Sequence, residues 1–155
     1  MIVEPAMMNA GIIPPDDGYL AAIRDLLHTA GALLIFDEVK TGFTTGPAGI
    51  TGLSGVTPDM VCLAKALGGG ISVAAIGGTT AVMSAIADGR YEQVGTFNGN
   101  PLAMAATRAN LSEVLNAAGY AQLDRLAARL RSSLESTIAE HGMAGAWSAS
   151  EPRGA

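Results

Sequence analysis

Two short apolar runs, each ending at a charged residue, decide the fold of this chain. The first is LLIF at 33–36, which stops at Asp37 and Glu38, and the second is MVCLA at 60–64, which stops at Lys65. Continuous apolar runs of this length are typical of parallel strands that are buried on both faces. Both charged ends then lie at the carboxyl edge of one sheet, which is where open α/β sheets bind ligands.

The sequence around these runs predicts the other elements of an α/β fold. Apolar residues recur at helical spacing between Asp17 and Ala30, and Gly31 follows as a stop signal. We also expect a strand ending at Val3, a loop at 44–55, a strand at 72–76, helices at 79–86, 101–117 and 120–140, and a frayed tail after Gly142 that includes Trp147. Strands that alternate with helices favour a mostly parallel sheet with crossover helices.

Composition and charge exclude several classes of function. The net charge of −5 provides no basic patch for nucleic acid, and the single cysteine, Cys62, excludes a disulfide framework and a cysteine-rich zinc site. No apolar run reaches the length of a membrane span, and no charged leader precedes a hydrophobic stretch at the N-terminus. We therefore expect a cytoplasmic protein that binds neither nucleic acid nor membrane and holds no metal.

A carboxylate and a lysine at neighbouring strand ends have two interpretations, a weak surface ion pair or part of a binding site. The surrounding residues favour a site. The stretches LLIFDEVKTGF at 33–43, LAKALGGG at 63–70 and GTFNGNPLAMAA at 95–106 resemble the cofactor-binding core of the class III aminotransferases, which are pyridoxal phosphate (PLP) enzymes of fold type I. The resemblance covers about residues 1 to 118 in the family's order, and the glutamate-1-semialdehyde aminomutases are the most similar branch.

The resemblance implies a particular domain organisation. Residues 1–118 correspond to the C-terminal part of the PLP-binding large domain, including the helix that leads to the next domain. Residues 119–155 correspond to an incomplete start of the small C-terminal domain. The strand at 72–76 is expected to run antiparallel to the others. By this comparison the chain looks like a fragment that lacks the N-terminal part of the enzyme.

The same resemblance assigns roles to four residues. Lys65 matches the lysine that binds the PLP aldehyde covalently, and Asp37 matches the carboxylate that pairs with the nitrogen of the pyridine ring. Val39 matches the residue under the ring, and Thr96 matches a threonine that reaches the PLP phosphate of the partner subunit in a homodimer. Side chains alternate along an extended chain, so Asp37 and Val39 share one face and Glu38, on the other, is interpreted as structural.

Three nearby polar residues have less specific interpretations. Asn9 is typical of the aminomutase-like members, but its setting in Met8-Asn9-Ala10-Gly11 is equally typical of a turn. Lys40 stands where some relatives carry a glutamine that reaches the phenolic oxygen of PLP, and we expect it to turn to solvent instead. His28 falls in the last turn of the predicted helix, where a helix-end role is expected rather than catalysis.

The expected function is PLP-dependent amino-group transfer on a small amino or oxo substrate. The aminomutase-like reaction, of the glutamate-1-semialdehyde to 5-aminolevulinate type, would exchange an amino group between neighbouring carbons of one molecule. An ordinary class III transaminase remains an alternative, because Phe97-Asn98 replaces the Leu-Ser that is commoner in the aminomutases and both reactions use Lys65 and Asp37. A truncated, non-catalytic remnant is the third possibility, in which the isolated chain would aggregate or bind PLP weakly.

Overall fold

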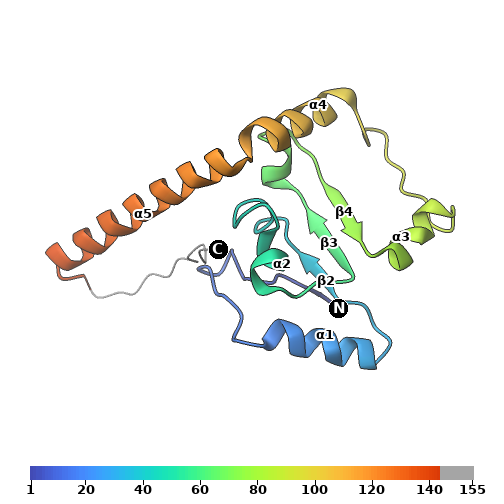
Figure 1. The fold of residues 1–155 in the computed structure, drawn as a ribbon, viewed down its shortest axis with the longest axis horizontal. Helices are drawn as coiled ribbons and strands as arrows, with labels where there is room; N and C mark the ends of the chain where they lie inside the picture. Colours follow the sequence, from blue (N-terminus) through green and yellow to red (C-terminus); the bar gives the residue numbers. More distant parts are fainter. Residues whose placement is uncertain (144–155) are drawn as a thin grey trace.

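A four-stranded mixed sheet forms the centre of the computed structural model, which describes residues 1–143 (Figure 1). Its strands, in spatial order, are β1 (Ile2–Val3), β2 (Ile35–Asp37), β3 (Met60–Leu63) and β4 (Ala75–Gly78). The first three run parallel, and β4 is antiparallel to β3. This arrangement confirms the predicted α/β fold with a mostly parallel sheet.

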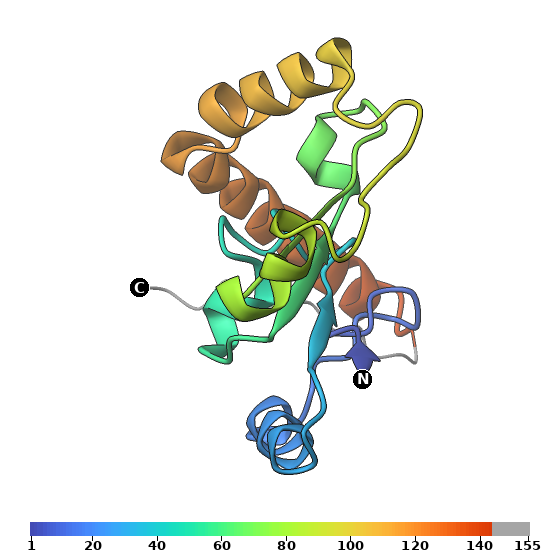
Figure 2. The same cartoon turned by 90° about the vertical axis from the view of Figure 1, so that its right-hand side faces the viewer.

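The helices connect and flank these strands. They are α1 (Tyr19–Thr29), α2 (Gly49–Ser54), α3 (Thr80–Ala87), α4 (Pro101–Ala109) and α5 (Ala117–Glu140), with a 3₁₀ helix η1 (Lys65–Gly68) and a π-helical turn η2 (Asn110–Val114). In both views α4 lies at the end of the sheet where β2 and β3 terminate, and α1 lies at the opposite end (Figures 1 and 2). Both α4 and η2 contact η1. Helix α5 extends away from the sheet (Figure 1).

One face of β2 forms the core. Leu34 and Phe36 are fully buried and pack with Leu20 of α1 and Ile50 of α2. Ile35 and Asp37, whose side chains alternate with these two, are only half-buried. The prediction of a strand buried on both faces is therefore wrong for this part of the chain, because α1 and α2 supply side chains to the same face. The second face carries Asp37.

Two predicted elements differ in position. Residues 44–55 were predicted as a loop, but they contain α2, whose backbone N–H groups at Ile50 and Thr51 donate to the buried Glu38 carboxylate. The strand predicted at 72–76 lies at Ala75–Gly78. β4 pairs with β3 only as far as Leu63–Ala75, because the chain that follows β3 turns into η1. Residues 72–74 therefore have no strand beside them.

The long helix predicted at 101–117 is interrupted. Helix α4 ends at Ala109, a π-helical turn follows, and α5 begins at Ala117 with Asn116 as its cap. The predicted gap between the helices at 101–117 and 120–140 is not at Gly119, which lies inside α5. The other two helix starts agree with the prediction, since Thr79 caps α3 and Asn100 caps α4. The domain boundary near 118 stays a prediction, and the tail expected at 144–155, with Trp147, lies outside the described residues.

Candidate functional site

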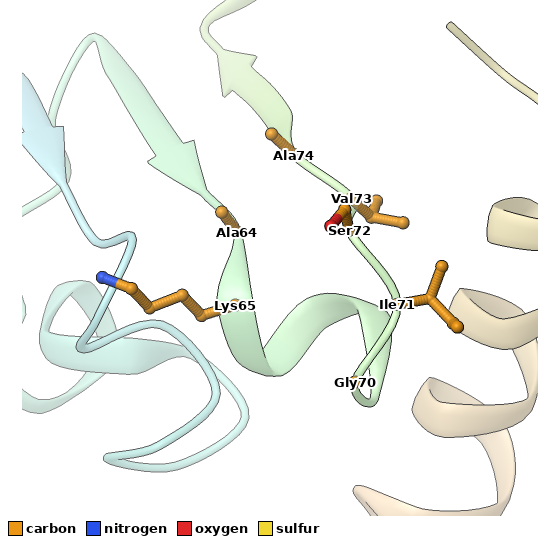
Figure 3. Close-up of a pocket in the computed structure, with 7 residues that line it drawn as sticks. All are labelled: Ala64, Lys65, Gly70, Ile71, Ser72, Val73 and Ala74. Atoms are coloured by element: carbon orange, nitrogen blue, oxygen red, sulfur yellow. The ribbon is translucent and has the colours of Figure 1, made fainter. Parts of the chain in front are cut away.

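Lys65 lies two residues after the end of β3 and is the first residue of the turn η1. Its backbone φ is +48°, a left-handed value that is uncommon for a residue with a side chain. Lys65 lines an open cavity of about 600 Å³ together with Ala64 and the segment 70–74. Figure 3 shows its side chain directed away from Ile71 and Val73 and toward the segment that follows β2. Its amine therefore extends toward the strand that ends in Asp37.

Asp37 is the last residue of β2 and lies beside Cys62 in the sheet. Its Oδ1 accepts the backbone N–H of Val39 at 3.0 Å, which closes a turn at the strand end. Burial raises the pKa of the Cys62 thiol, and the nearby negative charge of Asp37 raises it further. The Asp37 carboxylate therefore lies close to β3 at the carboxyl edge, on the side of the sheet that the core does not use.

The spacing of Asp37 and Lys65 suits a small ring between them. Neighbouring strands lie about 4.8 Å apart and three extended residues span about 10 Å, so the Cα atoms of Asp37 and Lys65 are on the order of 10 Å apart. Within residues 1–143 no ion pair joins the two side chains. The simple surface ion pair that the sequence also allowed is therefore not formed in the part of the chain that the structure describes.

The Glu38 carboxylate holds α2 next to the end of β2. Its side chain is 1% exposed. Oε2 accepts from Ile50 N at 2.7 Å and from the Thr41 hydroxyl at 2.9 Å. Oε1 accepts from Thr51 N at 2.9 Å and from the Thr51 hydroxyl at 2.6 Å. These contacts confirm the structural interpretation of Glu38. Val39 is half-buried and lies in the turn that the Asp37 carboxylate closes.

Thr96 lies apart from these residues. It belongs to the exposed segment between α3 and α4, and it does not line the cavity at Lys65. The end of that segment is fixed by Asn100, whose Oδ1 accepts the backbone N–H of Ala103, with Pro101 at the first position of α4. Within one chain, then, Lys65, Asp37 and Val39 come together at the carboxyl edge and Thr96 does not join them.

Two polar contacts, one near this edge and one at the opposite end of the sheet, were not expected from the sequence. The amine of Lys40 donates to Oδ1 of Asn9 at 2.6 Å, so the expectation that Lys40 turns to solvent is wrong. Asn9 follows Met7, which forms an isolated antiparallel bridge with Ile13, so a turn role and a site role both fit it. His28 does occupy the helix end, and its Nε2 lies 3.0 Å from Oδ2 of Asp59.

A third unpredicted residue, Asn110, supports the turn that contains Lys65. Its side chain is buried, and its Nδ2 donates to the backbone carbonyls of Ala66 and Leu67. The available signal was an asparagine in the middle of an Ala- and Leu-rich predicted helix, where its helix propensity is poor. That signal marks a polar side chain that needs partners, but it does not identify them.

A mixed α/β sheet with a carboxylate and a lysine at the ends of adjacent parallel strands places the chain among the α/β domains, whose ligands bind at the carboxyl edge of the sheet. Comparison with known families goes further, because residues 1–145 match the model of "Aminotransferase class-III". The chain belongs to the class III aminotransferase family. This membership confirms the resemblance seen in the sequence. Among the described residues no helix is both long and apolar enough to cross a membrane.

Individual relatives agree with this membership. The glutamate-1-semialdehyde 2,1-aminomutase of Thermomicrobium roseum is 46% identical over 144 residues, which are 92% of this chain and 34% of that protein. An omega-transaminase structure from Sphaerobacter thermophilus has a TM-score of 0.84 at 33% identity and covers 91% of this chain and 33% of its own.

A glutamate-1-semialdehyde aminomutase structure from Pseudomonas aeruginosa PAO1, in complex with PMP, has a TM-score of 0.76 at 33% identity over 90% of this chain and 33% of its own. These structures confirm the fold-type I prediction. The chain spans about a third of the length of the curated relatives it matches.

Proposed function

We propose that this chain carries part of the PLP-binding site of an enzyme that transfers amino groups by an aminomutase-like reaction. The observation that carries the proposal is the placement of Asp37 and Lys65 at the ends of adjacent parallel strands, with the Lys65 side chain directed toward the segment that follows β2 (Figure 3). Neither charge is neutralised by the other in the described residues, so both are available to a third group.

The free atoms of these side chains fit PLP. Within residues 1–143 the Oδ2 atom of Asp37 and the amine of Lys65 have no hydrogen-bond partner, whereas Oδ1 of Asp37 is fixed by the turn. Oδ2 is therefore free to accept a hydrogen bond from a protonated ring nitrogen, and the amine is free to bind an aldehyde carbon. Bound PLP supplies an electron sink that lowers the cost of removing a proton from the substrate.

The chain's own groups divide the work of the reaction. Asp37 keeps the ring nitrogen protonated, because its negative charge favours the cationic form. With PLP bound and its aldehyde released from Lys65, the Lys65 amine would move a proton between the nitrogen-bearing carbon of the substrate and the aldehyde carbon of the cofactor. Val39 would pack under the ring from the same side of the chain as Asp37. A small amino or oxo compound would bind next to the ring, within reach of the Lys65 amine.

The role of Thr96 requires a second copy of the chain. Its exposed position between α3 and α4 leaves its hydroxyl and backbone amide accessible to a phosphate group on a partner subunit, and both are suitable donors for an anion. We therefore infer that the intact enzyme is a homodimer that shares its two sites. A cytoplasmic location is part of the same proposal.

The direct test uses the two lysines of the chain, Lys40 and Lys65. The full chain is incubated with PLP, reduced with borohydride, and digested for mass spectrometry. We expect PLP to be fixed on Lys65, together with a visible absorbance band before reduction. Both signals should persist in Lys40→Ala and disappear in Lys65→Ala. Equal modification of the two lysines would contradict the proposal, because it would show only surface chemistry.

An ordinary transaminase is the second candidate. The Sphaerobacter thermophilus omega-transaminase has a TM-score of 0.84, above the 0.76 of the Pseudomonas aeruginosa aminomutase at the same 33% identity. The two reactions differ in the number of substrates. An aminomutase converts glutamate-1-semialdehyde without a second amino acceptor, whereas a transaminase needs an amine and an oxo compound together. Supplying each set of substrates to the PLP-loaded chain separates the two reactions.

A further inference from the structure

Asn110 connects the start of η2 to the turn that carries Lys65. Its single amide nitrogen, Nδ2, donates to two backbone carbonyls, to Ala66 at 2.6 Å and to Leu67 at 3.1 Å. The residue is 8% exposed, so these contacts are shielded from water. The contacts span more than 40 positions of sequence and connect the start of η2 with η1.

The carbonyl groups at the end of η1 have few other hydrogen-bond partners. The last carbonyls of a short helix have no partners within the helix. Here Gly69 N bonds to the Ala66 carbonyl at 3.3 Å, and the shorter bond to that carbonyl comes from Asn110. Gly69 itself has a left-handed φ of +58°, and a Cβ added there would lie 3.1 Å from Cγ of Asn110. The Asn110 side chain therefore holds η1 through its carbonyls and packs against the glycine that ends it.

The conformation of Lys65 depends on this turn. A non-glycine residue in the left-handed region is strained, and it persists only where the surrounding structure fixes it. Lys65 is the first residue of η1, so the two carbonyls held by Asn110 belong to the next two residues. The backbone of Asn110 is itself unusual, because its carbonyl accepts from Leu115 N in a π-helical turn. Such turns occur frequently at functional sites.

We propose that Asn110 is a positioning residue that holds the left-handed turn at Lys65 and so directs the Lys65 amine to the carboxyl edge of β2. This inference rests on the proposed role of Lys65 in binding PLP. Asparagine is suited to the task because it places two N–H groups of one atom on a short stem. Aspartate has the same size and no N–H, and it would set a negative charge against two carbonyl oxygens.

The test compares Asn110→Asp with the matched variant Asn116→Asp in the full chain. Asn116 is exposed, and its side chain also donates one N–H, to the Glu113 carbonyl. Hydrogen exchange is followed at the amides of residues 66–71, with α1 as the internal reference. We expect Asn110→Asp to accelerate exchange at 66–71 about tenfold and to leave α1 unchanged. Asn116→Asp should leave both regions unchanged.

A second readout follows the amine itself. After PLP treatment and borohydride reduction, the ratio of modified Lys65 to modified Lys40 should fall about tenfold in Asn110→Asp and stay at the wild-type value in Asn116→Asp. Asn110→Ser, which keeps one donor, should give intermediate values in both measurements. If Asn110→Asp does not fold, Asn110→Ser alone decides the result.

The two readouts separate this inference from the proposed function. Unchanged exchange at 66–71 in a folded Asn110 variant would overturn the inference, and so would uniform acceleration across α1 and η1. Faster exchange at 66–71 with an unchanged lysine ratio would also overturn it, because the turn would then not control the amine. If wild-type Lys65 shows no preference for PLP, the proposed function fails, and the exchange data still decide whether Asn110 holds the turn.

Discussion

Replacement of Glu38 by glutamine tests whether one buried carboxylate holds α2 against the site. The two carboxylate oxygens of Glu38 accept from different backbone amides, Oε2 from Ile50 and Oε1 from Thr51. Glutamine has a single acceptor oxygen, so one of these amides would face an NH₂ group. The hydroxyl groups of Thr41 and Thr51 can rotate to accept from that NH₂ group, but a backbone N–H cannot reverse its direction.

The expected cost follows from this count. A buried donor that loses its partner costs about 1–3 kcal/mol, and exchanging a charged acceptor for a neutral one weakens the remaining bonds. We therefore expect Glu38→Gln to lower the free energy of unfolding by about 2–4 kcal/mol. Domains of this size are stable by about 5–15 kcal/mol, so the loss is a large share. Urea unfolding followed by far-UV circular dichroism measures it.

The matched control is Glu92→Gln, which makes the same change at an exposed position and should cost less than about 0.5 kcal/mol. An independent check uses two glycines with left-handed φ. A Cβ at Gly49 would collide with Oε2 of Glu38, whereas one at Gly55 would meet no atom within 4 Å. Gly49→Ala should therefore destabilise more than Gly55→Ala. A loss in Glu38→Gln no larger than that in Glu92→Gln would refute the reasoning.

Two further predictions concern ionisable groups. The pKa of Asp59 is lowered chiefly because its carboxylate accepts the backbone N–H of Leu34. The ionised carboxylate therefore stabilises the folded chain fully above the unfolded pKa of about 4, and this stabilisation is lost as pH falls through the folded pKa. Urea titrations should show Asp59→Asn to be less stable than wild type at pH 7, with a smaller difference in the free energy of unfolding at pH 3. The negative charge of Asp37 helps raise the pKa of the Cys62 thiol. The pH profile of Cys62 alkylation by iodoacetamide should therefore move to lower pH in Asp37→Asn. An unchanged profile would show that the two side chains are not close.

Patterns that are local in sequence predicted most of the sheet and the central part of the site. The apolar runs before Asp37 and Lys65 identified two parallel strands, and alternation along the chain separated the half-buried Asp37 from the buried Glu38. The residues that cap α3 and α4 were also recognisable, because capping depends on side chains within one turn of the helix. These features require only the neighbouring residues, so a single sequence carries them.

The features that the sequence did not predict depend on partners that are distant along the chain. Helix α2 forms in a segment rich in Gly and Thr because Glu38, about a dozen residues earlier, accepts its first N–H groups. In the helix predicted from Pro101 to Ala117, the α-helical pattern changes to a π-helical turn at Asn110, whose side chain bonds to carbonyls more than 40 positions away. Local propensity ranks asparagine as a weak helix former but does not specify what its amide will bind. Asn110 thus begins the π-helical turn and also bonds to the turn that follows Lys65, so a residue that is locally a weak helix former connects this helix to the candidate site.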